Sequence, residues 1–225
     1  SSDLRTAVCA GQCENHRAVF CGHYAEIAAD GEVMAEWMIK RLIAQGREME
    51  SQIAARDRAL VAGVDAQLEQ HFLTPGQRLS PPGVGNVMLL MVCLTLGLAG
   101  VMGLATDVAA AWSGRTSAAV LMGSGAIVAV WMTLILFQLV QGKNSGVVLL
   151  QYYLGMLGLC CLGAAVAWAK GVTGIAPVAM LLGGAVGGAL FSNRAAFYLY
   201  VAYFRTRRRV FIKRRWQRED LRNTR

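Results

Sequence analysis

The chain has 225 residues, of which 55% are apolar and 16% are charged, and its formal net charge is +8. This composition excludes a disordered chain, a collagen and a small secreted fold held together by disulfide bonds. Residues 1–204 carry 12 Lys/Arg and 12 Asp/Glu, whereas residues 205–225 carry 10 Lys/Arg and only two acidic residues. The excess of positive charge therefore belongs to the C-terminal segment and not to the chain as a whole.

Residues 1–73 predict a helical domain outside the membrane. Two segments, 3–29 and 32–72, share a spacing in which apolar side chains recur at alternating intervals of four and seven residues. The positions are Cys9, Cys13, Phe20 and Tyr24 in the first segment, and Met38, Leu42, Met49, Ile53, Leu60 and Val64 in the second. An 11-residue repeat keeps one apolar stripe on one side of an almost straight helix. Residues 32–72 therefore predict a rod of about 60 Å at 1.5 Å per residue, and the two helices predict a hairpin or a bundle completed by another subunit.

Four side chains that bind soft metals share one face of the first predicted helix: Cys9, Cys13, His16 and His23. Zinc or copper accepts such donors, but the spacing fits no zinc module, and ligands on one straight helix cannot readily close a tetrahedron without a second chain. We favour the alternative that Cys9 and Cys13 are small buried packing residues, and we expect no cofactor. Ser1–Ala10 lacks the basic and apolar regions of a signal peptide, so we expect this domain in the cytosol.

Residues 74–85 form a linker in which Pro75, Pro81 and Pro82 alternate with glycines and interrupt the helix. The linker predicts the boundary between the cytosolic domain, 1–73, and a transmembrane domain expected at 86–204.

Four stretches without any charged residue follow, at 79–106, 116–142, 144–169 and 171–193. A bilayer core of about 30 Å requires roughly 20 apolar helical residues, and each stretch is long enough. None of them alternates as the strands of a membrane barrel do. The sequence therefore predicts an all-α, polytopic membrane protein with four transmembrane helices.

The orientation of the spans follows from the basic segment 205–225, because basic residues that flank a span stay in the cytoplasm. The loops between the spans decide little, since each carries a single basic residue: Arg115, Lys143 or Lys170. We therefore expect a multi-pass protein of a bacterial inner membrane with both termini in the cytoplasm.

Glycines gather in the predicted spans, where 19 of the 25 lie between Gly83 and Gly188. In the fourth span, Gly183, Gly184, Gly187 and Gly188 form two overlapping pairs four residues apart. Small residues at this spacing let two helix backbones approach closely. We favour packing inside one four-helix bundle, with a dimer or partner interface as the alternative.

The few polar residues in the spans are functional candidates, because polar groups in hydrocarbon are costly. They include Asp107, Gln138, Gln151 and Arg194. If the fourth span ends at residue 193, Arg194 lies at the cytoplasmic interface and residues 195–204 form an interfacial helix. A span that reached residue 204 would place Arg194 near the midplane. The first register costs less and is the one we expect, and we expect Asp107 at the outer surface rather than as a proton carrier.

The basic tail contains seven candidates for binding anionic lipid headgroups or an acidic protein partner: Arg205, Arg207, Arg208, Arg209, Lys213, Arg214 and Arg215. The positive-inside rule alone would also explain them. Nucleic acid is not expected as a partner, because no recognition motif accompanies the charge. Apolar residues continue through this region at Phe197, Val201, Phe204 and Phe211, which predicts that the last span extends as one helix able to pack against the N-terminal rod.

No catalytic set emerges from the sequence. The three histidines, His16, His23 and His71, all lie in residues 1–73, no hydrolase, zinc-protease or Walker motif is present, and Glu48 and Glu50 predict a solvated face of the rod. We therefore predict a non-enzymatic subunit, scaffold or assembly factor of a larger inner-membrane complex, which contacts the lipid bilayer and docks other subunits or a second copy through its cytosolic helices and glycine-rich spans. The alternative is a small transporter or channel, with metal sensing through the Cys/His face.

Overall fold

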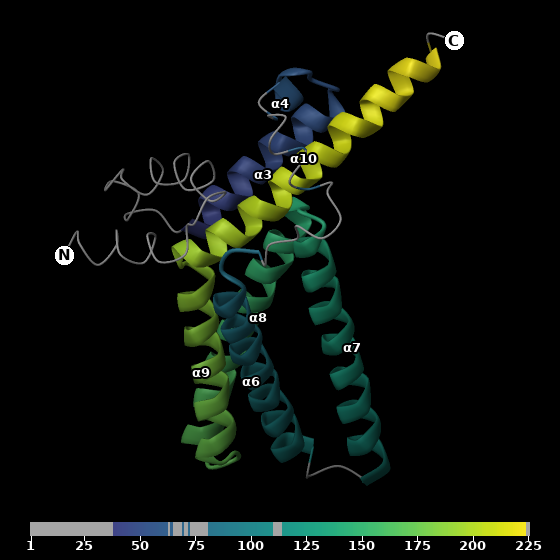
Figure 1. Ribbon diagram of the computed structural model, residues 1–225. Coiled ribbons are helices and arrows are strands. Elements are labelled where there is room, and N and C mark those ends of the chain that lie inside the picture. Colours follow the sequence, from purple (N-terminus) through teal and green to yellow (C-terminus); the bar gives the residue numbers. More distant parts are fainter. Residues whose placement is uncertain are drawn as a thin grey trace, which may run out of the picture. The chain divides into compact units, whose positions relative to one another are not determined.

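The computed structural model describes residues 38–62, 64, 69, 72, 81–109 and 114–223, and in this part of the chain the regular structure is entirely helical (Figure 1). The chain divides into two units, Ser1–Trp37 and Met38–Arg225. The first predicted helix, with its Cys/His face, lies outside the described residues.

Four helices of this unit are long and apolar enough to cross a membrane, as predicted: α6 (Val84–Ala109), α7 (Gly114–Val140), α8 (Asn144–Ala169) and α9 (Ile175–Ser192). The protein is therefore a multi-pass membrane protein. The turn between α7 and α8 passes through Gly142 at a φ of +66°, a left-handed conformation that favours glycine.

α6 and α9 approach each other so closely that their backbones touch. A Cβ atom on Gly184 would overlap the backbone N and Cα of Gly97, and one on Gly100 would lie 2.6 Å from the backbone N of Leu181. Without these side chains the two helices gain dispersion contacts along their length. The helix that lies against Gly184 therefore belongs to the same chain.

α7 contributes least to the bundle. Only 11% of its span Leu121–Val140 is buried, against 28% of the α6 and α8 spans and 22% of the α9 span. In Figure 1 it stands apart from the other three apolar helices over much of its length. Most of the surface of α7 is therefore not covered by the described part of this chain.

Two further helices, α3 (Met38–Ala54) and α10 (Ala195–Asn223), lie at the end of the bundle where α7 meets α8 (Figure 1). They run side by side in the same direction, because contacts advance along both: Tyr198 with Gln45, Arg208 with Glu50, and Glu219 with Arg56. This pairing confirms that the helix after the fourth span packs against the N-terminal rod.

The predicted continuous rod over residues 32–72 is wrong, because α3 ends at Ala54. The N–H of Asp57 bonds the carbonyl of Gln52 and the N–H of Arg56 bonds that of Ile53, and Arg56 has a φ of +53°. This hydrogen-bond pattern is the Schellman motif, which stops a helix and turns the chain. The short helix α4 (Ala59–Ala62) follows and packs on α10.

The last span does not continue into α10 as a single helix. α9 ends at Ser192 and α10 begins at Ala195, so Arg194 lies in the turn between them, over the ring of Phe191 at 4.7 Å. This is the register that the sequence favoured. The side chain of Asn193 also accepts a 3.5 Å hydrogen bond from the N–H of Ile39, near the start of α3.

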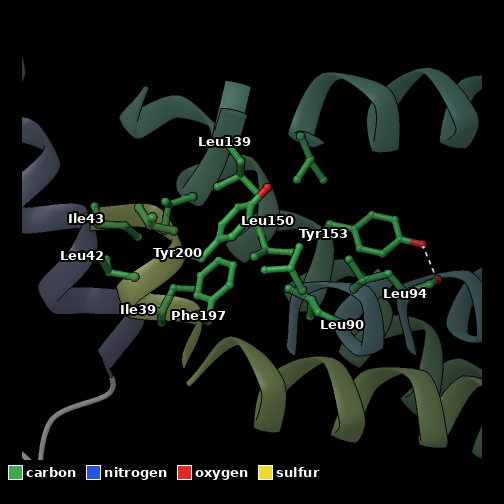
Figure 2. Packing of buried hydrophobic residues seen from close by; sticks show 14 of the residues in the cluster. Ile39, Leu42, Ile43, Leu90, Leu94, Leu139, Leu150, Tyr153, Phe197 and Tyr200 are labelled. Atoms are coloured by element: carbon green, nitrogen blue, oxygen red, sulfur yellow. Dashed lines mark hydrogen bonds between the residues drawn. The ribbon is translucent and has the colours of Figure 1, made fainter. Parts of the chain in front are cut away.

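One apolar core joins the bundle to the α3–α10 pair (Figure 2). Its buried members come from all of these elements except α9: Ile39, Leu42 and Ile43 of α3, Leu90 and Leu94 of α6, Leu139 of α7, Leu150 and Tyr153 of α8, and Phe197 and Tyr200 of α10. The stripe predicted for α10 is wrong at Phe211, which is 44% exposed, whereas Val210 is fully buried. Because of this core, the outer helix pair is anchored to the spans rather than tethered by the chain alone.

Candidate functional site

The most elaborate polar site in the described residues joins three segments that are far apart in the sequence. We call α3, α10 and the α7–α8 connection Gly142–Asn144 the platform. At its centre, Nη2 of Arg205 donates a 3.2 Å hydrogen bond to Oδ1 of Asn144, the first residue of α8. Both atoms lie over Gly46 of α3, where a Cβ would overlap them. The missing side chain of Gly46 therefore lets α3 come close enough to cover this hydrogen bond.

Glu50 provides the second link between the three segments. Its Oε1 accepts a 3.0 Å hydrogen bond from the backbone N–H of Asn144 and lies 3.5 Å from Nη1 of Arg208. Arg208 also donates to the carbonyl of Gly142 at 3.3 Å. A carboxylate at the N-terminus of α8 interacts favourably with the helix dipole. Glu50 thus accepts from the first N–H of α8, while its side chain, 41% exposed, stays partly on the solvated face that the sequence predicts.

Arg205 is the most deeply buried charged residue of the platform, with a side chain only 6% exposed and an Nε atom that has no partner among the described residues. Burial lowers the pKa of Arg205 to about 10, while the charge of Glu50 opposes that shift. The guanidinium stays protonated at neutral pH and acts as a hydrogen-bond donor. Its chemistry is that of a structural cation rather than a general base.

The seven basic residues predicted as one anionic-partner surface divide into two groups. Besides Arg205 and Arg208, three of them make contacts within the chain. Lys213 and Arg214 lie 3.3 and 3.1 Å from the carboxylate of Glu69, and Arg215 pairs with Glu219 at 3.0 Å. Arg207 and Arg209 form neither an ion pair nor a side-chain hydrogen bond within the described part of the chain; Arg209 is exposed, and Arg207 lies over the ring of Phe211 at 5.6 Å.

The ion pairs of Glu69 predict a pH dependence of stability. Hydrogen bonds from Arg214 and Lys213 lower the pKa of Glu69 below its usual value of 4.5. A lowered folded-state pKa contributes stability that is complete above the usual value and is lost as the pH falls through the folded-state pKa. Unfolding measurements in detergent should therefore find Glu69→Gln less stable than the wild type at pH 7, with a difference that shrinks below pH 4.5. An unchanged difference at acid pH would contradict the assignment.

An open hollow of about 300 Å³ lies between the end of α3 and the second half of α10. Glu219 pairs with both Arg56 and Arg215 in its wall. The other lining residues include Ile53, Ile212 and Trp216. The hollow gives the platform a concave surface whose charged groups already pair with one another.

Asp107, at the opposite end of the bundle, has a structural role. Its Oδ2 accepts hydrogen bonds from the hydroxyl of Thr173 at 2.5 Å and from the N–H of Gly174 at 3.4 Å, at the start of α9. The carboxylate of α6 therefore caps α9, the neighbour against which α6 packs. This contact supports the expectation that Asp107 is not a proton carrier.

Substitutions of Asp107 test whether its carboxylate stabilises the start of α9. We expect Asp107→Ala to lower the free energy of unfolding by about 1 kcal/mol, as loss of a helix cap usually does. Asp107→Asn keeps an acceptor oxygen and should cost less. Chemical unfolding in mixed micelles would measure both, and equal effects of the two substitutions would contradict a capping role.

The remaining polar residues of the spans are not brought together. Oε1 of Gln138 accepts a 3.1 Å hydrogen bond from the hydroxyl of Ser145 across the α7–α8 turn. Gln151 is exposed on α8, and its amide has no hydrogen-bond partner in the described ranges. Within those ranges, no three His, Cys, Asp or Glu side chains are grouped closely enough to hold a metal ion. The Cys/His face lies outside them, so its metal affinity stays a prediction.

No protein-family model, curated protein sequence or solved structure matches this chain.

Proposed function

We propose that the protein is a non-catalytic subunit, scaffold or assembly factor of a larger inner-membrane complex, and that the platform is where it docks its partners on the cytoplasmic side. The observation that carries this proposal is the double attachment of the platform. An apolar core fixes it to the spans, and so do the hydrogen bonds of Arg205 and Glu50 to Asn144, the first residue of α8. A rigidly placed surface is suited to positioning another subunit relative to the membrane, because little conformational entropy is lost on binding.

The interior of the bundle supports a scaffold over the alternative of a transporter or channel. A path for a polar solute requires polar groups around a water-filled cavity. Between α6, α8 and α9, the described interior is instead filled by large apolar side chains, all buried: Leu90, Leu94, Leu150, Leu157 and Leu181.

The glycines of α9 are poor candidates for the docking surface, because they already pack within the chain. Gly184 lies against Gly97, Gly187 against Cys93, and Gly188 against Leu154 and Leu94. These positions are occupied within the chain, so the proposal assigns docking to the platform. The cytoplasmic orientation rests on the basic segment of α10 and the positive-inside rule.

Native electrophoresis of gently solubilised membranes tests this function. The protein is expected to migrate in an assembly larger than itself, with the other subunits identified by mass spectrometry. The double variant Arg207→Glu/Arg209→Glu changes the two residues of the predicted basic surface that make no ion pair and no side-chain hydrogen bond in the described chain, and it should deplete those subunits. Lys170→Glu, which reverses an exposed charge beyond the far end of α8, is the matched control and should leave them in place. A lone monomer with measurable solute flux in vesicles would overturn the proposal.

A further inference from the structure

One face of α8 carries a regular row of residues, four of them glycine or alanine, that the described chain leaves largely uncovered. The residues recur at intervals of four and three, the repeat of a left-handed helix pair: Gln151, Gly155, Gly158, Leu162, Ala165 and Ala169. We call this row the α8 seam. Gly155, Ala165 and Ala169 are exposed, and Leu162 is 67% exposed. A Cβ added at Gly155 or Gly158 would meet no atom within 4 Å.

The seam contrasts with the glycines on α6 and α9. Gly97 and Gly184 are small because another backbone of the same chain lies against them. Gly155 and Gly158 have no such neighbour, although a helix exposed to lipid gains nothing from lacking side chains there. Glycine also costs helix stability relative to alanine, by roughly 1 kcal/mol. Gly123 of α7 is equally open, so an uncovered glycine alone does not identify a partner; Gly155 and Gly158 differ from it because they share one face of α8 with Gln151.

The side-chain amide of Gln151 independently requires a hydrogen-bond partner. It lies seven residues after the start of α8, about 10 Å along the helix axis, and belongs to an otherwise apolar face. A primary amide exposed to hydrocarbon lacks the hydrogen bonds that water would supply, so it is costly until another polar group reaches it. The described chain supplies no such group.

We propose that the α8 seam is a self-association surface at which two copies of this chain pack α8 against α8. All copies enter the membrane in the same orientation, so a twofold axis along the membrane normal makes the two helices parallel. Each Gln151 then meets its symmetry mate at the same depth, where a side-chain amide can both donate and accept. The Gln151 amide of one copy can therefore hydrogen-bond the Gln151 amide of the other. For this reason we take the partner that covers the α8 seam to be a second copy of the chain.

This inference does not depend on the proposed function, because it concerns copies of the chain alone. It can therefore be tested in vesicles that contain no other protein. Full-length protein fused at its C-terminus to donor or acceptor fluorescent proteins is reconstituted at decreasing protein-to-lipid ratios, and energy transfer reports the dimer fraction.

Two matched substitutions separate the seam from other lipid-exposed surfaces. Gly155→Leu adds a side chain at the seam, whereas Gly123→Leu adds the same side chain to α7 at an exposed glycine that is equally open. Neither should disturb the fold, because nothing lies within 4 Å of either added Cβ. We expect Gly155→Leu to weaken association about tenfold or more, and Gly123→Leu to leave it unchanged.

Substitutions of Gln151 test the polar contact. Gln151→Leu should weaken association, and Gln151→Asn, which keeps the amide, should restore part of it. The proposal would be overturned if the wild type showed only the energy transfer expected from random collisions at every protein density. The α8 seam would then face lipid or a different protein. A Gly123→Leu variant as impaired as Gly155→Leu would also overturn the proposal.

Discussion

Gly184→Ala is expected to lower the free energy of unfolding by about 2 to 3 kcal/mol, because the added methyl group must displace a backbone. Its Cβ would overlap the backbone N and Cα of Gly97, neither of which can rotate away as a flexible side chain would. α6 and α9 would have to move apart along their shared interface. Unfolding of the purified protein in mixed micelles, followed by circular dichroism, measures the loss.

The neighbouring glycine is the control for this substitution. An added Cβ at Gly183 lies 3.5 Å from Cδ2 of Leu96, an ordinary van der Waals contact. Gly183→Ala carries the same gain in helix propensity and should leave the stability unchanged or slightly raised. Equal losses for the two variants would show that the α6–α9 contact at Gly97 is not what Gly184 provides.

Gly46→Leu is expected to cost about 2 kcal/mol and to loosen the platform from the bundle. The new side chain would occupy the space of Asn144 Oδ1 and Arg205 Nη2 and would separate their hydrogen bond. A buried guanidinium that loses its partner keeps its desolvation cost without compensation. Limited proteolysis with trypsin, which cuts after Lys40 and Arg41 of α3, should become several-fold faster, together with a lower unfolding free energy.

A substitution near Gly46 on the same helix serves as the control. Ala44 is exposed, so Ala44→Leu adds a side chain where there is room, changes no tryptic site, and should leave the cleavage rate of α3 near that of the wild type. If both variants released α3 equally, the close approach at Gly46 would not be what fixes it.

The four spans could be predicted from the sequence because each is a local property. A charge-free stretch of sufficient length has few alternatives, and the ends of α8 fall beside Lys143 and Lys170, the residues that interrupt the charge-free stretches. Close packing at Gly184 was predicted on the same local ground. The sequence did not show that Gly97 is the partner of Gly184. A glycine pair four residues apart packs equally well against a helix of the same chain and against a helix of another chain.

The platform could not be predicted, because its contacts join residues far apart in the chain. Gly46, Glu50, Asn144 and Arg205 carry no motif, and a lone glutamate beside basic residues resembles an ordinary solvated face. The end of α3 at Ala54 was missed because its left-handed residue is Arg56, where glycine would have given the signal. Val210 was missed because α10 contacts both α3 and α4, and because Lys213 of α10 also donates to the carbonyl of Val64.

The arrangement of the platform also fixes the order in which it can form during synthesis. α3 leaves the ribosome before any of the four spans, yet the partners of Glu50 and Gly46 are Asn144, Arg205 and Arg208. A helix whose apolar side is uncovered is a substrate for chaperones and proteases. α3 must therefore wait, unpaired at the membrane surface, until the α7–α8 hairpin has inserted and α10 has been translated. The platform can be completed only after α10 has been translated, so a complete platform marks a chain whose four spans have all been synthesised.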